Sequence, residues 1–258
     1  MRRIILLLTT AILGGCSGEY ILTAPDAAVL AGQDAPLVVR LQRRELWRYA
    51  PPQTGAAVTF QLGEGSPQCA RTDEAGYAAL SIKAPGQPGQ YNVALYHQDI
   101  NGDSAKGAAA IYVLAPDKPI AVVDTDSLPR SDKQVAQAVG AIVRIQLTAQ
   151  VIYVTKKYSG RPARARELLT GHGYPDGPVV PYSGTRRWWK RHRSGADAME
   201  ELHRRFPKLR WGITDDDDAA EAFANAGLKV LIIGREKVEI EDVERFGSWA
   251  EVKITSSE

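Results

Sequence analysis

Residues 120–126 read IAVVDTD, a run of four apolar residues that ends in two aspartates, Asp124 and Asp126. A short, continuous apolar run bounded by polar residues is typical of a strand buried on both faces of a parallel sheet. In such a sheet, ligands bind beyond the carboxyl ends of the strands. The stretch therefore predicts an α/β fold and places two carboxylates at its binding edge.

The chain after residue 126 alternates between helical and strand patterns. Apolar spacing predicts helices at residues 131–147, 162–169, 196–206 and 216–225, and strands at residues 151–154, 209–213 and 229–233. This alternation predicts a three-layer α/β domain with a mainly parallel sheet, which we assign to residues 119–258.

Polar residues also follow two later strands of this domain. Thr155 ends one of them, and the acidic run Asp215 to Asp218 ends the other. Carboxylates from two strand ends would repel each other unless a cation lies between them, and hard oxygen ligands suit Mg²⁺. A carboxylate can then attack a phosphorus atom whose charge the metal offsets. The other reading of both acidic groups is that they cap helix N-termini.

Asp-x-Asp after one strand, Thr155 after a second and the acidic run after a later one resemble the ordered motifs of the haloacid-dehalogenase (HAD) superfamily. Residues 151–178, with Tyr153, Thr155 and the turn GYPDGP at 173–178, are similar to lipin-type phosphatidate phosphatases and their bacterial relatives. The resemblance implies a HAD-like (Rossmannoid) fold and phosphatase activity.

By position, the resemblance implies that Asp124 is the nucleophile that forms an aspartyl-phosphate. It makes Asp126 the general acid for the leaving group and then the base for water, and gives Thr155 a hydrogen bond to the phosphoryl oxygens. The implied Mg²⁺ ligands are Asp124, the backbone carbonyl of Asp126, and Asp215 with Asp216 or Asp218.

Two positions depart from the pattern of the family. Leu128 stands where the first motif usually has Thr, and Ser194-Gly195 stand where the third motif needs a cation for transition-state charge. Lys190 and Arg193 lie nearby and are the candidates for this cation. The departures leave open an inactive HAD-like lipoprotein that serves as a binding or structural module of the envelope.

The segment Arg186 to Arg193 interleaves basic residues with two tryptophans. This pattern suits an anionic interface or a phosphorylated substrate, and equally suits an exposed loop whose tryptophans pack on the domain.

The N-terminal half, residues 20–115, has the rhythm of an all-β sandwich. Short alternating runs separated by turn residues predict strands at 37–41, 57–62, 70–72, 77–82, 91–96 and 108–114. The stretches TDEAGYA at 72–78 and PGQY at 88–91 resemble bacterial immunoglobulin-like repeats. The resemblance implies a spacer or binding module.

Residues 1–15 have a basic start and a short apolar core, as in a signal peptide, and they precede Cys16. The sequence LGGC at 13–16 resembles the lipobox of bacterial lipoproteins, which implies acylation of Cys16 and a lipid anchor in the cell envelope. Ser17, instead of an Asp retention signal, favours the periplasmic face of the outer membrane. The alternative is an ordinary signal peptide with a chance cysteine.

Net charge and cysteine content limit the kinds of partner and cross-link that the chain can be expected to have. A net charge of +2 is too balanced to predict nucleic-acid binding, and Cys69 has no cysteine partner once Cys16 is acylated, which excludes a disulfide framework. The leading hypothesis is a membrane-anchored, Mg²⁺-dependent phosphatase acting on a phosphorylated small molecule or on a phospholipid such as phosphatidate. A protein partner is not predictable from the sequence.

Overall fold

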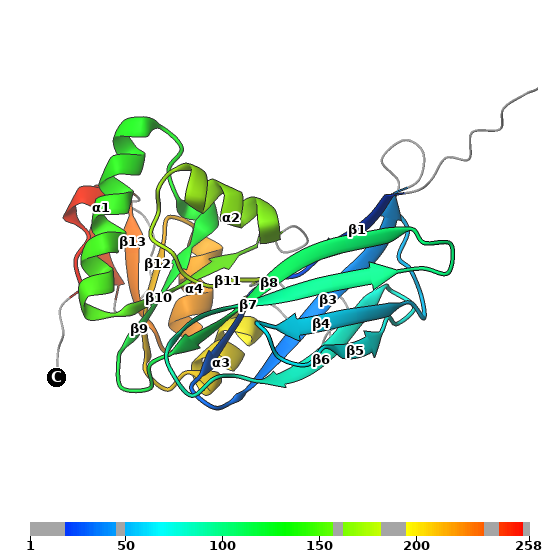
Figure 1. The fold of residues 1–258 in the computed structure, drawn as a ribbon. Coiled ribbons are helices and arrows are strands. Elements are labelled where there is room, and N and C mark those ends of the chain that lie inside the picture. Colours follow the sequence, from blue (N-terminus) through cyan, green and yellow to red (C-terminus); the bar gives the residue numbers. More distant parts are fainter. Residues whose placement is uncertain (1–18, 45–49, 157–161, 182–194, 235–242, 255–258) are drawn as a thin grey trace, which may run out of the picture.

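The computed structural model describes residues 19–44, 50–156, 162–181, 195–234 and 243–254. Residues 19–114 form an elongated β-sandwich, and residues 120–254 form an α/β part at one end of it (Figure 1). Among the described residues, no helix is long and apolar enough to span a bilayer. Cys16, Lys190 and Arg193 lie outside the described residues.

The sandwich consists of two sheets. The three-stranded sheet has the order β1-β3-β6 and the five-stranded sheet the order β2-β8-β7-β4-β5. Neighbouring strands are antiparallel, except that β2 runs parallel to β8. The strands are β1 (Glu19–Thr23), β2 (Ala27–Leu30), β3 (Asp34–Arg44), β4 (Ala57–Leu62), β5 (Gln68–Arg71), β6 (Tyr77–Lys83), β7 (Gly89–Gln98) and β8 (Ser104–Leu114).

Alternating apolar residues build the core of the sandwich. Val39, Phe60 and Ile111 are each fully buried between the two sheets. The turn before β6 is fixed by Asp73, whose carboxylate accepts the backbone N–H groups of Ala75 and Tyr77. The six predicted strands are confirmed, whereas β1 and β2 were not predicted from the sequence.

The α/β part contains a sheet of six parallel strands in the order β11-β10-β9-β12-β13-β14. The strands are β9 (Ile120–Asp124), β10 (Gln150–Thr155), β11 (Val179–Pro181), β12 (Leu209–Thr214), β13 (Lys229–Ile233) and β14 (Val243–Phe246). In chain order this is 3-2-1-4-5-6, the doubly wound arrangement, so the direction of winding reverses between β9 and β12. The predicted parallel sheet is confirmed, and β11 and β14 are additional strands.

Helices cover both faces of this sheet. One face packs on α1 (Asp132–Thr148) and α2 (Pro162–Gly171), and the other packs on α3 (Gly195–Arg205) and α4 (Asp217–Asn225). Short 3₁₀ helices, η2 (Thr125–Ser127) and η3 (Trp249–Glu251), follow β9 and β14. Along β9, Ala121 and Val123 join the core under α1, while Ile120 and Val122 join the core under α4. Burial on both faces explains the continuous apolar run.

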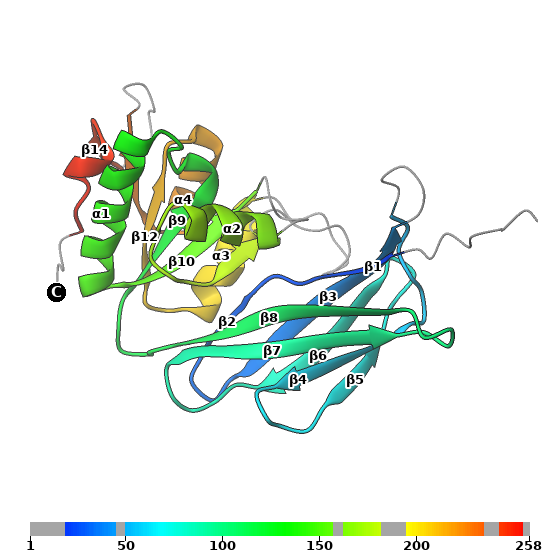
Figure 2. The same ribbon diagram turned by 45° about the horizontal axis from the view of Figure 1, so that its top comes forward.

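The sandwich and the α/β part share buried residues. Ala28 and Leu114 of the sandwich belong to the same apolar cluster as the residues of α3 and α4. Figure 2 shows the β2/β8 edge of the sandwich beside the α/β part. The Asp26 carboxylate bonds the Arg166 guanidinium and accepts the N–H of Val179 at 2.9 Å. These contacts attach the sandwich directly to edge strand β11.

Candidate active site at the carboxyl edge of the parallel sheet

Asp124 occupies the carboxyl end of β9, at the point where the winding of the sheet reverses. Its neighbour across this point is β12, whose register pairs Ile213 with Val123 and so brings Thr214 beside Asp124. Ligands of doubly wound sheets bind in the crevice that such a reversal leaves between strand ends. The topology therefore places Asp124 where a substrate would enter.

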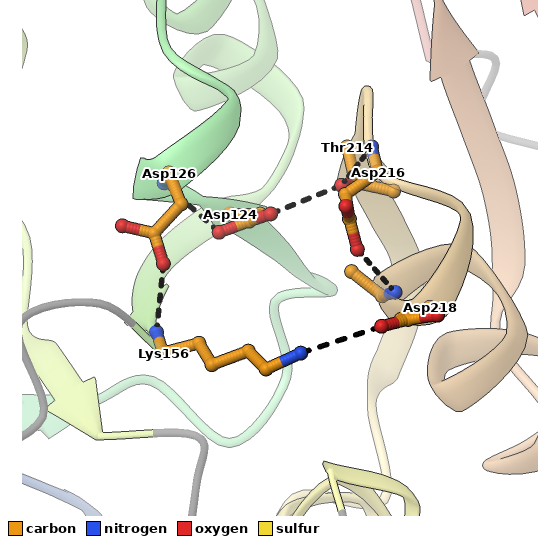
Figure 3. A network of polar contacts seen from close by, with 7 residues as sticks. Asp124, Asp126, Lys156, Thr214, Asp216 and Asp218 are labelled. Atoms are coloured by element: carbon orange, nitrogen blue, oxygen red, sulfur yellow. Dashed lines mark hydrogen bonds and ion pairs between the residues drawn. The ribbon is translucent and has the colours of Figure 1, made fainter.

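The Asp124 side chain is buried and held by three donors. Its Oδ1 accepts the backbone N–H of Asp126 at 2.9 Å, and its Oδ2 accepts the hydroxyls of Ser127 at 2.8 Å and Thr214 at 3.0 Å. Asp124 is only 3% exposed. Figure 3 shows the carboxylate between Asp126 on one side and Thr214 on the other.

Burial raises the pKa of Asp124 from 3.8 to about 6. The hydrogen bonds from Asp126, Ser127 and Thr214 act in the opposite direction, and the nearby charge of Asp126 adds to the increase. Loss of hydration is the largest of these effects, because a carboxylate in a low-dielectric environment is costly to ionise.

Two hydroxyls that sequence reasoning missed join the ends of β9 and β12. The Ser127 and Thr214 oxygens lie 2.8 Å apart, and each accepts a backbone N–H from the turn that follows β12. Ser127 accepts from Asp215 and Thr214 from Asp216, at 2.9 and 3.0 Å. The available signal was the position of Thr214, immediately before the acidic run.

Asp126 and Thr155 lie at the same edge of the sheet as Asp124. Asp126 is exposed, in contrast to the fully buried Thr155. The Thr155 hydroxyl donates to Asp126 Oδ1 at 3.4 Å, and the backbone N–H of Lys156 donates to Asp126 Oδ2 at 2.9 Å. The structure thus brings Asp124, Asp126 and Thr155 together.

The aspartates of the acidic run after β12 make different contacts. Asp216 is the N-cap of α4 and accepts the N–H of Ala219 at 3.0 Å, as its helix-capping interpretation predicts. Asp218 forms an ion pair with the Lys156 ammonium, with 3.4 Å between Nζ and Oδ2. Asp215 is partly exposed and its backbone is held by Ser127. Metal binding by Asp215, Asp216 and Asp218 stays a prediction.

The oxygen donors at this edge are of the kind that a magnesium ion prefers. No group of three or more His, Cys, Asp or Glu side chains in the described part of the chain is arranged to hold a metal. Mg²⁺ is commonly bound through one or two carboxylates and keeps several waters. Asp124 and Asp215 lie at the adjoining ends of β9 and β12, and the backbone carbonyl of Asp126 follows Asp124, so this edge offers two carboxylates and one carbonyl. A set of this size is what Mg²⁺ uses when it keeps several waters, and its binding here stays a prediction.

Leu128, which stands in place of the family's Thr, is 4% exposed and packs in the core under α1 with Val135 and Tyr174. Its side chain therefore serves packing and does not reach toward the carboxylates. Of the predicted set, Lys190 and Arg193 fall in residues 182–194, outside the described part of the chain.

No protein-family model matches the chain, and no curated protein sequence matches it at a significant level. Several solved structures, including the following three, align with parts of the chain. The D,D-heptose 1,7-bisphosphate phosphatase from Burkholderia thailandensis aligns at 14% identity and a TM-score of 0.35, covering 52% of this chain and 94% of that one. The D00-D0 domain of intimin aligns at 20% identity and a TM-score of 0.28, covering 38% of this chain and 48% of that one.

The third is a bacterial immunoglobulin-like domain from the M. primoryensis ice-binding adhesin. It aligns at 10% identity and a TM-score of 0.25, covering 38% of this chain and 97% of that one. The present chain spans about half of the intimin fragment. All three TM-scores are 0.35 or lower, so these alignments do not establish a family for the chain.

Proposed function

We propose that this chain hydrolyses phosphate monoesters through a phosphoryl group carried transiently on Asp124. The observation that supports the proposal is the pairing of two carboxylates in opposite environments at the reversal point of the sheet. Asp124 is buried and held by three donors, whereas Asp126 is exposed two residues later. A fixed nucleophile and an accessible acid–base group need these two environments.

In the first step, Asp124 Oδ1 attacks phosphorus. Within the described contacts, Oδ1 accepts one hydrogen bond and Oδ2 accepts two, so Oδ1 retains more capacity to form the new bond. The bond between phosphorus and the alcohol oxygen breaks, and the departing oxygen takes a proton from Asp126. In the second step, water gives a proton to Asp126, attacks phosphorus and releases phosphate, which restores the Asp124 carboxylate.

The neighbouring groups orient these atoms. Ser127 and Thr214 hold Oδ2 and so fix the plane of the nucleophilic carboxylate. Thr155 lies within hydrogen-bonding distance of Asp126, on the side where the phosphoryl oxygens would lie. A magnesium ion bound by Asp124, Asp215 and the backbone carbonyl of Asp126 would offset the negative charge that these oxygens carry.

The proposal also names a cellular location for the protein and a class of substrate. Acylation of Cys16 would anchor the chain in a bacterial cell envelope, on the periplasmic face of the outer membrane. The substrate is then a phosphorylated small molecule or a phospholipid such as phosphatidate. The support is the signal-like segment, the lipobox-like sequence at 13–16 and the resemblance carried by residues 151–178.

The test is phosphate release from a panel of phosphomonoesters, including phosphatidate vesicles, with and without Mg²⁺. We expect Asp124→Asn to abolish turnover and Asp126→Asn to slow it by roughly 10²- to 10⁴-fold, the usual contribution of a general acid–base group. Asp117→Asn changes an exposed aspartate of the linker and should leave the rate unchanged. A folded wild-type protein that releases no phosphate would instead support the inactive binding module.

A further inference from the structure

Lys156 connects the two sides of the candidate site. It follows Thr155 at the carboxyl end of β10, and its backbone N–H donates to Asp126. Its side chain crosses to the first turn of α4, where the ammonium meets Asp218 (Figure 3). One lysine therefore contacts the proposed acid–base residue through its backbone and the acidic turn through its side chain.

The ion pair between Lys156 and Asp218 is open to solvent. The side chains are 57% and 80% exposed, and the two charged atoms lie 3.4 Å apart. Exposed pairs of this kind contribute little to stability, because water screens them and both side chains lose rotamer freedom. The backbone of Lys156, by contrast, directly follows β10 and is held by its hydrogen bond to Asp126. The ammonium can thus change partners while it stays near the site.

A phosphate dianion that approaches this edge meets several carboxylates. Asp124, Asp126 and the run from Asp215 to Asp218 all lie there, and their charges would repel the substrate unless cations offset them. A lysine ammonium is a point charge with three donors, and its hydrogen bonds to phosphate oxygens are charge-assisted. Lys156 already lies between Asp126 and Asp218.

We propose that Lys156 binds the phosphoryl oxygens of the substrate and that Asp218 holds its ammonium at the mouth of the site until phosphate displaces it. The inference rests on the proposed function. It gives the proposed site a positively charged side chain at the end of β10, the strand next to the one that carries Asp124. It assigns Asp218 a restraining role toward Lys156, so that the two residues have opposite effects on phosphate binding.

The experiment is a titration of the full chain with inorganic phosphate in the presence of Mg²⁺, followed by calorimetry or by ³¹P NMR. We expect Lys156→Gln to weaken phosphate binding about tenfold, equivalent to about 1.4 kcal/mol, and Lys156→Arg to retain most of it. Asp218→Asn should tighten binding severalfold, because the ammonium no longer has to leave a carboxylate. Lys118→Gln, an exposed linker lysine, is the matched control for the loss of one positive charge.

The double variant Lys156→Gln/Asp218→Asn decides the mechanism. If Asp218 acts through Lys156, the double variant binds phosphate as weakly as Lys156→Gln alone, since the tightening needs the ammonium. Tightening that persists in the double variant, or wild-type affinity in Lys156→Gln, overturns the inference. Because binding is measured without turnover, a chain that binds phosphate through Lys156 and hydrolyses nothing refutes only the proposed function. If Lys156→Gln leaves the phosphate affinity and the KM unchanged while the chain still hydrolyses phosphomonoesters, only this inference is refuted.

Discussion

At the scale of single residues, Asp124 and Asp126 have the same side chain in different environments. Asp124 is 3% exposed and bonded to two hydroxyls and a backbone N–H, while Asp126 is exposed and accepts from Thr155 and Lys156. Environment, not residue type, separates a nucleophile from an acid–base group in carboxylate pairs. In this chain the two environments differ because β9 ends at Asp124 and η2 carries Asp126 out toward solvent.

The raised pKa of Asp124 predicts a pH-dependent stability of the metal-free protein. The pKa is about 6 in the folded chain and 3.8 in the unfolded one, so the folded chain retains a proton that the unfolded chain releases between these values. The free energy of unfolding should therefore fall by up to about 3 kcal/mol from this group as the pH rises from about 4 to above 6. Urea unfolding in EDTA at a series of pH values measures it.

Asp124→Asn is the variant that isolates this effect. It carries no titrating group at position 124, so its stability should not fall over the same pH window, whereas Asp117→Asn should follow the wild type. Parallel pH–stability curves for wild type and Asp124→Asn would show that the buried carboxylate does not titrate in this range.

At the scale of elements, β12 and α4 act as one unit that presents the acidic turn. Gly212 of β12 lies directly under Phe223 of α4, and a Cβ at Gly212 would come within 2.4 Å of the aromatic ring. Absence of a side chain at Gly212 thus allows α4 to lie close to the sheet. The close approach sets the position of the N-terminal turn of α4, which carries the Asp218 that meets Lys156.

Gly212→Ala tests this packing. Because the added methyl group meets a buried ring and the strand backbone cannot move freely, we expect a loss of about 1–3 kcal/mol in stability, together with weaker phosphate binding as α4 shifts. Gly140→Ala is the matched control. Position 140 lies inside α1, where a Cβ meets only the tip of Arg144 at 3.6 Å.

The control should change stability in the opposite direction, since alanine in a helix interior is favoured over glycine by about 0.5–1 kcal/mol. Thermal unfolding of both variants measures the contrast. Equal stability of Gly212→Ala and the wild type would mean that α4 is not held by this contact.

At the scale of the whole molecule, the sandwich packs against the α/β part at edge strand β11. Asp26 satisfies both backbone groups of Val179 on edge strand β11, through its carboxylate and its own N–H. Tyr112 donates to Asp176, and the Gln150 amide bonds both backbone groups of Ala115 in the linker. Edge strands expose unpaired backbone groups, and here the sandwich covers one.

Arg166→Met tests whether this junction stabilises the fold. The Asp26 side chain is 0% exposed, and removal of its partner leaves a buried carboxylate unpaired, which should cost about 3 kcal/mol. The double variant Asp26→Asn/Arg166→Met should recover part of the loss, since no buried charge remains. Urea unfolding measures both.

An exposed ion pair supplies the comparison. The side chains of Arg44 and Glu19 are 55% and 67% exposed, so Arg44→Met should cost at most about 1 kcal/mol. If Arg166→Met costs no more than Arg44→Met, the ion pair between Arg166 and Asp26 contributes little to the stability of the fold.

The sequence predicted the interior of the fold better than its edges. The predicted helices match α1 to α4 within two residues at each end, and the buried strands β9, β10, β12 and β13 were found from their apolar runs. The four strands that were missed, β1, β2, β11 and β14, all lie at sheet edges. Three of them, β1, β11 and β14, are short and mostly half-buried, so they lack the periodic or continuous pattern of a core strand. The fourth, β2, is a mostly buried run of four residues, the lower limit of strand length.

What the sequence determined by itself is the order of the chemistry-bearing strand ends. The runs before Asp124, Thr155 and Asp215 are local patterns, and parallel strands bring their carboxyl ends to one edge. The tertiary structure alone decided which atoms meet there, because hydrogen-bond partners distant in the chain have no local signature. The Thr214 hydroxyl on Asp124 and the Lys156 ammonium on Asp218 join segments 90 and 62 residues apart. Only the packing of β12 and α4 against β9 and β10 could place them.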